Sequence, residues 1–165
     1  MNQHFVWTKN NEWETPIDYW KQIVDLIPTE LKINDPFYMN GNAKKHWKKL
    51  SREIIHENKD FYKIEKNNNK EIFVSNPPHT KFHLLLEHLF YLDKPFILLI
   101  PINKIANKKT QKILIEKNNI QIIPSPIYKG FITPEGLQTR GCPQYYCYLC
   151  YKFNLPCDLY FMKEN

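Results

Sequence analysis

Short apolar runs that alternate with amphipathic segments are the feature that most constrains the fold of this chain. The clearest runs are 72–75, 96–100 and 120–123, and the amphipathic segments 81–92 and 108–117 lie between them. Each run has the length of a strand that is buried on both faces, and each amphipathic segment has the length of a helix. The alternation predicts an α/β fold with a mainly parallel sheet and helices on both of its faces.

Weaker signals add further elements at both ends of this pattern. A helix is predicted over 16–26 because its apolar residues have helical spacing, with Thr15 as its cap and Pro16 at its first position. The length of 165 residues predicts one domain over residues 1–165. The other predicted elements are strands over 31–33, 53–56 and 145–153 and a helix over 43–50.

The charge of the chain favours a polyanionic partner. The formal net charge is +6, which is the sign expected of a protein that binds DNA or RNA. The first residues are polar and do not form a signal peptide, and the longest apolar run, 95–102, is too short to span a bilayer. We therefore expect a soluble intracellular protein, cytoplasmic or nuclear, that does not enter a membrane.

Four cysteines lie late in the chain and are read as thiols or metal ligands rather than disulfides. Cys142, Cys147, Cys150 and Cys157 follow the spacing C-x4-C-x2-C-x6-C, whereas zinc sites favour close pairs separated by a longer loop. Cys147 and Cys150 differ by an odd number of positions within one predicted strand, so their side chains should lie on opposite faces of the sheet. This pattern favours buried core thiols over a metal site, and no metal is expected.

A double-proline corner follows the buried run 72–75. The tetrapeptide is Asn76-Pro77-Pro78-His79, and each proline fixes its own backbone angle φ. The corner is therefore stiff, and the Asn76 side chain and the Pro77 carbonyl present hydrogen-bond acceptors. Parallel sheets bind ligands beyond the carboxyl ends of their strands, which is where this corner is predicted to lie.

The corner resembles the (Asp/Asn/Ser)-Pro-Pro-(Tyr/Phe/Trp) motif of the class I, S-adenosylmethionine-dependent amino-methyltransferases. In that family the first side-chain oxygen and the first proline carbonyl accept hydrogen bonds from the target amino group, and the fourth residue stacks on a flipped base. The resemblance implies catalytic roles for Asn76, Pro77, Pro78 and His79. Position 79 departs from the pattern, because histidine replaces a larger aromatic residue.

Segments elsewhere in residues 12–130 extend the resemblance. In the family, a Thr-Pro before the first helix and an Asp-Pro-x-x-Gly loop after the first strand meet the methionine part of the cofactor. An acidic segment with Asp-Phe after the second strand meets its ribose and adenine. Read without the family, these segments are a helix cap, an Asp-Pro turn and a charged surface turn. The resemblance implies that S-adenosyl-L-methionine contacts Thr15, Pro16, Asp35, Pro36, Phe37, Gly41, Glu57, Asp60 and Phe61.

The family resemblance implies a Rossmann-like class I methyltransferase fold that methylates an exocyclic amino group, with N6 of adenine in DNA or RNA as the expected target. Asn76 follows Asp35 by only 41 positions, which implies trimmed second and third strand–helix units. Target specificity would come from the loop 129–143 or from a partner subunit. Two alternatives stay open: a methyltransferase-like subunit without catalysis that binds nucleic acid or a catalytic partner, and a protein methyltransferase acting on a glutamine amide.

Overall fold

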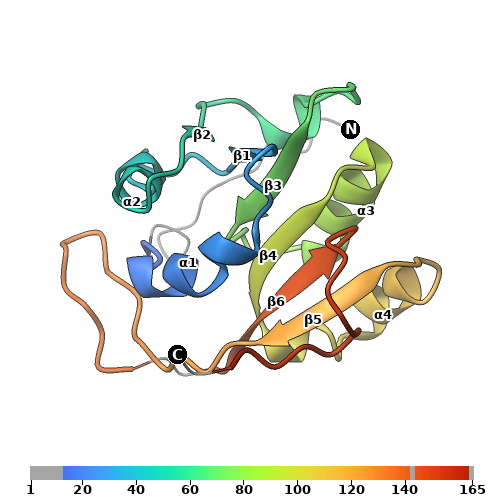
Figure 1. Ribbon diagram of the computed structural model, residues 1–165. Helices are drawn as coiled ribbons and strands as arrows, with labels where there is room; N and C mark the ends of the chain where they lie inside the picture. Colours follow the sequence, from blue (N-terminus) through green and yellow to red (C-terminus); the bar gives the residue numbers. More distant parts are fainter. Residues whose placement is uncertain (1–12, 142–143, 164–165) are drawn as a thin grey trace.

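The computed structural model describes residues 13–141 and 144–163, and these form one six-stranded mixed sheet in the order β2-β1-β3-β4-β6-β5 (Figure 1). Every strand except β6 runs in the same direction, and β6 lies antiparallel between β4 and β5. The strands are β1 (Lys32–Asn34), β2 (Ile54–Ile55), β3 (Glu71–Ser75), β4 (Phe96–Pro101), β5 (Ile120–Pro124) and β6 (Tyr146–Tyr151).

Helices cover both faces of this sheet (Figure 1). One core contains the apolar side chains of the first two helices, and the other core contains those of the last two. None of the described helices is long and apolar enough to cross a membrane. The helices are α1 (Ile17–Ile23), α2 (Ala43–Lys49), α3 (Phe82–Leu92) and α4 (Lys108–Leu114), and the 3-10 turns are η2 (Val24–Leu26), η3 (Phe61–Lys63) and η4 (Ile102–Lys104).

The structure confirms the predicted α/β fold and the mainly parallel sheet. Each predicted strand and helix is present, with ends that differ by a few residues. The last helix, predicted over 108–117, ends at Leu114, and the last strand, predicted over 145–153, ends at Tyr151 because Lys152 has a φ of 51°. That left-handed conformation cannot continue a strand.

The cysteines of β6 point into different cores, as their spacing predicts. Cys147 packs with α3 and α4, whereas Cys150 packs with α1 and α2. Burial raises the pKa of Cys147 to about 12, so its thiol keeps its proton at neutral pH. Cys157 is exposed, and Cys142 lies outside the described residues. The described residues contain no group of three or more His, Cys, Asp or Glu that is placed to hold a metal ion.

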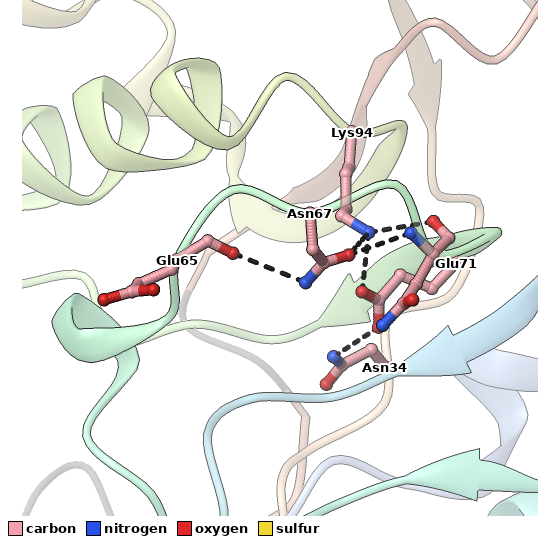
Figure 2. Close-up of polar contacts among 6 residues, drawn as sticks. Asn34, Glu65, Asn67, Glu71 and Lys94 are labelled. Carbon is pink, nitrogen blue, oxygen red and sulfur yellow. Dashed lines mark hydrogen bonds and ion pairs between the residues drawn. The ribbon is translucent and has the colours of Figure 1, made fainter.

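A buried ion pair closes the amino edge of the sheet (Figure 2). Lys94 Nζ lies 2.6 Å from Glu71 Oε1, and both side chains are only 5% exposed. The ammonium group also donates to Asn67 Oδ1 at 2.6 Å and to the Asn69 carbonyl at 2.8 Å. Asn34 Nδ2 donates to the second carboxylate oxygen of Glu71 at 2.9 Å. The network therefore satisfies both charges and ties β1, β3 and the start of β4 together.

Removing one charge of this pair should destabilise the protein strongly. Lys94→Met leaves the Glu71 carboxylate buried without its counterion, and we expect a loss of about 3 to 5 kcal/mol in the free energy of unfolding, measured with urea. The matched control, Lys70→Met, changes an exposed lysine of the same edge and should stay within about 0.5 kcal/mol of the unmodified protein. The double variant Lys94→Met/Glu71→Gln should recover part of the loss. Equal free energies of unfolding for Lys94→Met and Lys70→Met would contradict this account.

Candidate functional site

The strand order reverses between β1 and β3, because the chain goes from β1 outward to β2 and then returns across β1 to form β3. At such a reversal, the carboxyl ends of the parallel strands diverge and leave a crevice that binds ligands in α/β proteins. A pocket opens at this point, next to the start of α1. Its lining consists of Glu14, Thr15, Trp20, Asp35, Phe37, Tyr38, Met39, Asn40, Ala43, His46, His56, Ser75 and Asn76.

A buried carboxyl group forms the floor of this pocket. Asp35 directly follows β1 and is 5% exposed. Its Oδ1 accepts hydrogen bonds from Ser75 Oγ at 2.6 Å and from the Phe37 backbone N–H at 3.2 Å. Burial raises the pKa of Asp35 to about 6, although these hydrogen bonds favour the ionised form. The carboxylate is therefore ionised at neutral pH but poorly solvated, and it should attract a cationic ligand.

An imidazole ring faces the same pocket from the end of β2. His56 Nδ1 lies 2.8 Å from the Asp35 backbone carbonyl, and the ring stacks on Tyr38 with a centroid distance of 4.9 Å. A carbonyl oxygen only accepts, so Nδ1 must carry a proton. In the neutral ring, Nε2 is then an acceptor, and this buried atom has no hydrogen-bond partner among the described residues. An unpaired buried acceptor in a pocket wall fits a ligand that donates a hydrogen bond.

The double-proline corner brings a second unpaired acceptor to the pocket. Asn76 Nδ2 donates to Thr15 Oγ1 at 3.0 Å, which fixes the orientation of the amide. Asn76 Oδ1 is buried, and no described residue bonds to it. Pro77 and Pro78 are buried behind it. The structure thus brings Thr15 and Asn76, which are 61 positions apart in the sequence, into direct contact.

The rim of the pocket is closed by polar contacts of Glu14. This carboxylate lies 2.9 Å from His46 Nε2 and accepts from Asn42 Nδ2 at 2.6 Å, so it joins the segment before α1 to α2. The Glu14 backbone N–H also donates to the Ile132 carbonyl at 2.8 Å, and the Ile132 N–H donates to the Glu14 carbonyl at 3.0 Å. The space in the pocket is about 40 Å³, which is room for a few water molecules. A ligand of nucleoside size therefore enters only if this rim opens.

The residues expected from the acidic segment lie away from this lining. Glu57 is exposed and forms an ion pair with Lys59 at 2.6 Å. Asp60 accepts from the Tyr62 backbone N–H at 3.1 Å and so caps η3. Phe61 is buried, with its ring 4.9 Å from that of Phe37. Phe61 therefore supports a lining residue, whereas Glu57 and Asp60 belong to the surface turn and the cap.

Three further residues of the resemblance are not in the lining but are next to lining residues in the chain or contact them. Pro16 and Pro36 are buried next to Thr15 and Asp35. Gly41 has a φ of 77°, and its N–H donates to the Tyr38 carbonyl at 2.8 Å, which closes the turn after β1. A Cβ atom at this position would lie 2.9 Å from the Tyr38 hydroxyl. Glycine is thus required by the turn and by the position of the tyrosine ring.

His79 lies beside the pocket, on the side of β4 and β6. Its ring centroid is 6.3 Å from that of Tyr146, and its backbone carbonyl accepts from Lys104 Nζ at 3.1 Å. Burial lowers the pKa of His79 to about 4, with a smaller contribution from the Lys104 charge. The ring is therefore neutral at physiological pH. Its buried Nδ1 has no partner among the described residues.

Sequence reasoning missed several residues of the lining, above all Glu14, His46, His56 and Ser75. His46 and His56 show no spacing typical of metal ligands, which is why they attract no attention in the sequence. Ser75 and His56 could have been found from a simpler signal. Each stands at the carboxyl end of a predicted strand, at the edge where α/β sheets bind ligands.

No family model, curated protein or solved structure matches this chain. The function of the pocket must therefore be inferred from its own residues and from the resemblance of the short motifs.

Replacement of His79 should change how stability depends on pH. The folded pKa of about 4 lies below the ordinary value of 6.5, so the unfolded chain binds a proton between these values and the folded chain does not. Stability is therefore lost as the pH falls through this window. His79→Phe removes the titrating group, and we expect the unmodified protein to lose about 1 to 2 kcal/mol more than the variant between pH 7 and pH 5.

Urea unfolding at the two pH values measures this difference. Asp35 titrates in the same range with the opposite sign, since its pKa is raised, but it is present in both proteins and cancels in the comparison. Parallel loss of stability in the two proteins would show that His79 is charged in the folded state at pH 5.

Proposed function

We propose that this chain is an S-adenosylmethionine-dependent N-methyltransferase with a trimmed class I, Rossmann-like fold. Its target is an exocyclic amino group, most directly N6 of adenine in DNA or RNA. The observation that carries the proposal is the buried, unpaired Oδ1 of Asn76 at the carboxyl end of β3, in the wall of a pocket that also holds Asp35. A planar amino group is the donor that such a fixed acceptor suits.

The arrangement of the sheet supports the same assignment. The mixed sheet, in which β6 lies antiparallel between β4 and β5 and the other strands are parallel, is compatible with a Rossmann-like fold. The pocket occurs at the reversal of strand order, where α/β folds bind nucleotides.

The chemistry of the lining fits the cofactor, which carries positive charge on its sulfonium and ammonium groups. Asp35 supplies a buried carboxylate, and His56 Nε2 supplies an unpaired acceptor. Aromatic side chains, which attract cations through their ring faces, also line the pocket. The residues that would hold the cofactor are Thr15, Trp20, Asp35, Phe37, Tyr38 and His56. Opening of the Glu14–His46 contact would make room for it.

When bound, S-adenosylmethionine supplies an electrophilic methyl group. The task of the protein is then to position the target nitrogen and to favour its lone pair over conjugation with the ring. Asn76 Oδ1 accepts a hydrogen bond from the target amino group, while Thr15 holds the amide in place. Pro77 and Pro78 stiffen the backbone that carries this acceptor, so the geometry is fixed before the substrate arrives.

The neutral ring of His79 supports a base as the target. It is the fourth residue of the corner, and its ring is uncharged at physiological pH because its pKa is about 4. An uncharged ring stacks on a base, as the larger aromatic residue does in the family motif. The net charge of +6 favours nucleic acid over a glutamine side chain as the substrate.

Substitution of Asn76 tests the chemistry. Asn76→Ala should lower methyl transfer by about 100- to 1000-fold, because it removes an acceptor that acts on the reacting nitrogen. Its affinity for S-adenosylmethionine, measured by calorimetry, should change little. Asn76→Asp keeps an acceptor oxygen and should retain transfer. Asn103→Ala, an exposed asparagine of η4 at the same edge, is the matched control and should be fully active.

Mass spectrometry of nucleosides after incubation with DNA and with RNA provides the readout and separates the two substrates. Transfer by Asn76→Ala at the unmodified rate would place the chemistry elsewhere. Absence of S-adenosylmethionine binding at millimolar concentration would reject the enzyme and leave the non-catalytic methyltransferase-like subunit.

A further inference from the structure

Two tyrosine rings form an exposed pair next to the candidate site. Tyr128 and Tyr145 are 58% and 72% exposed, and their ring centroids lie 5.7 Å apart with a tilt of 43°. Large aromatic side chains with this exposure contribute nothing to the core. Exposed aromatic rings can stack on flat ligands such as bases, and tyrosine side chains lose little conformational freedom on binding. We call Tyr128 and Tyr145 the tyrosine pair.

The tyrosine pair lies at the carboxyl edge of the sheet, the same edge as the pocket. Tyr145 precedes the antiparallel strand β6, and its carbonyl accepts from the Ile102 N–H at 2.9 Å, just beyond the end of β4. Tyr128 follows the end of β5 by four positions. Tyr146, which follows Tyr145 in the chain, has its ring centroid 6.3 Å from that of His79. The pair therefore lies at the same edge of the sheet as the double-proline corner, next to the strand whose first residue, Tyr146, approaches His79.

Local contacts hold the tyrosine pair in place. A Cβ atom at Gly141 would lie 3.1 Å from Tyr128 Cε1, so the glycine backbone packs directly against that ring. The residue after Tyr128 is anchored as well, because the Lys129 carbonyl accepts from Tyr19 Oη at 3.0 Å, and Tyr19 is fully buried. The rings are thus preorganised, which lowers the entropic cost of stacking on them.

The charge around the tyrosine pair is mainly positive. Lys104 donates to the His79 carbonyl of the corner and follows Ile102, which bonds to the Tyr145 carbonyl, by two positions. Lys129 follows Tyr128 in the chain, and the exposed Arg140 precedes Gly141, which packs against the Tyr128 ring. Asp18 neutralises Lys129 at 2.7 Å, which leaves Lys104 and Arg140 to meet a ligand. Basic side chains beside exposed aromatic rings are the combination that binds single-stranded nucleic acid, through phosphates and stacked bases.

We propose that the tyrosine pair binds the unpaired bases of a single-stranded nucleic acid, next to the base that enters the pocket. Tyr128 and Tyr145 stack on successive bases, while Lys104 and Arg140 meet the backbone phosphates. The proposal rests on the proposed function for the role of the neighbouring base. Stacking itself requires neither the cofactor nor an adenine.

The test uses a fluorescein-labelled thymidine 12-mer as the probe, with binding to the full-length chain followed by fluorescence anisotropy. Tyr128→Ala and Tyr145→Ala should each weaken binding about tenfold, while Tyr145→Phe, which keeps the ring, should bind as the unmodified protein does. Tyr91→Ala is the matched control, because Tyr91 is 62% exposed at the end of α3, near the opposite edge of the sheet, and its loss should leave binding unchanged. A duplex of equal length should bind less tightly than the single strand.

The outcomes separate this proposal from the proposed function. Thymidine has no exocyclic amino group, so the probe binds without any methyl transfer, and Asn76→Ala should bind it normally. If both tyrosine variants bind the 12-mer as tightly as the unmodified protein, or if the unmodified protein binds no single strand at low salt, the tyrosine pair is not a nucleic-acid site even where methyl transfer is observed. If these variants lose binding and the unmodified protein shows no methyl transfer, the proposed methyltransferase activity is overturned. The chain would then be a subunit that binds single strands.

Discussion

The hydrogen bond between Ser75 Oγ and Asp35 Oδ1 connects the two strands on which the candidate site depends. It joins the carboxyl ends of β1 and β3 at 2.6 Å, inside a part of the molecule with almost no access to water. Through the same carboxyl group the turn after β1 is fixed by the Phe37 N–H, and the Asp35 carbonyl orients His56 at the end of β2. Three strand ends are thus set by one residue, and the two unpaired acceptors of the pocket take their positions from it.

Buried polar groups of the Lys94–Glu71 network are paired at the amino edge of the sheet, whereas two buried acceptors at the carboxyl edge are not paired with any described residue. At the amino edge, Lys94 and Glu71 are fully paired and further bound by asparagine side chains and a carbonyl, which is what structural stability requires (Figure 2). At the carboxyl edge, His56 Nε2 and Asn76 Oδ1 are buried without partners. A protein loses free energy by leaving such atoms unpaired, so the presence of two of them in one pocket wall, at the reversal of strand order, favours a binding site there over a structural network.

Most of the fold could be predicted from the sequence, because strand and helix periodicities depend on neighbouring residues. The run 96–100 and the helix 81–92 are examples in which local pattern and burial agree. The double-proline corner and Asp35 could also be placed at one edge from the direction of the strands. The contacts of the site could not be predicted from the sequence. The contacts of Thr15 with Asn76, and of Glu14 with His46, join segments whose distance depends on how the sheet and helices pack. Glu57 shows the same limit: of two neighbouring residues just after β2, His56 lines the pocket and Glu57 is exposed, and the sequence does not reveal which of them faces the pocket.

The raised pKa of Asp35 favours a cationic ligand in this small pocket. Burial opposes ionisation of this carboxyl group, so the folded protein carries an unfavourable charge at neutral pH when no cation is near. A ligand with positive charge relieves this cost on entry and can therefore offset the loss of the Glu14–His46 contact that closes the rim. Binding of a cation should in turn lower the pKa of Asp35, since an opposite charge favours the ionised form. The free energy of binding and the protonation of Asp35 are coupled in this way, whether the bound cation is the proposed cofactor or another positively charged ligand.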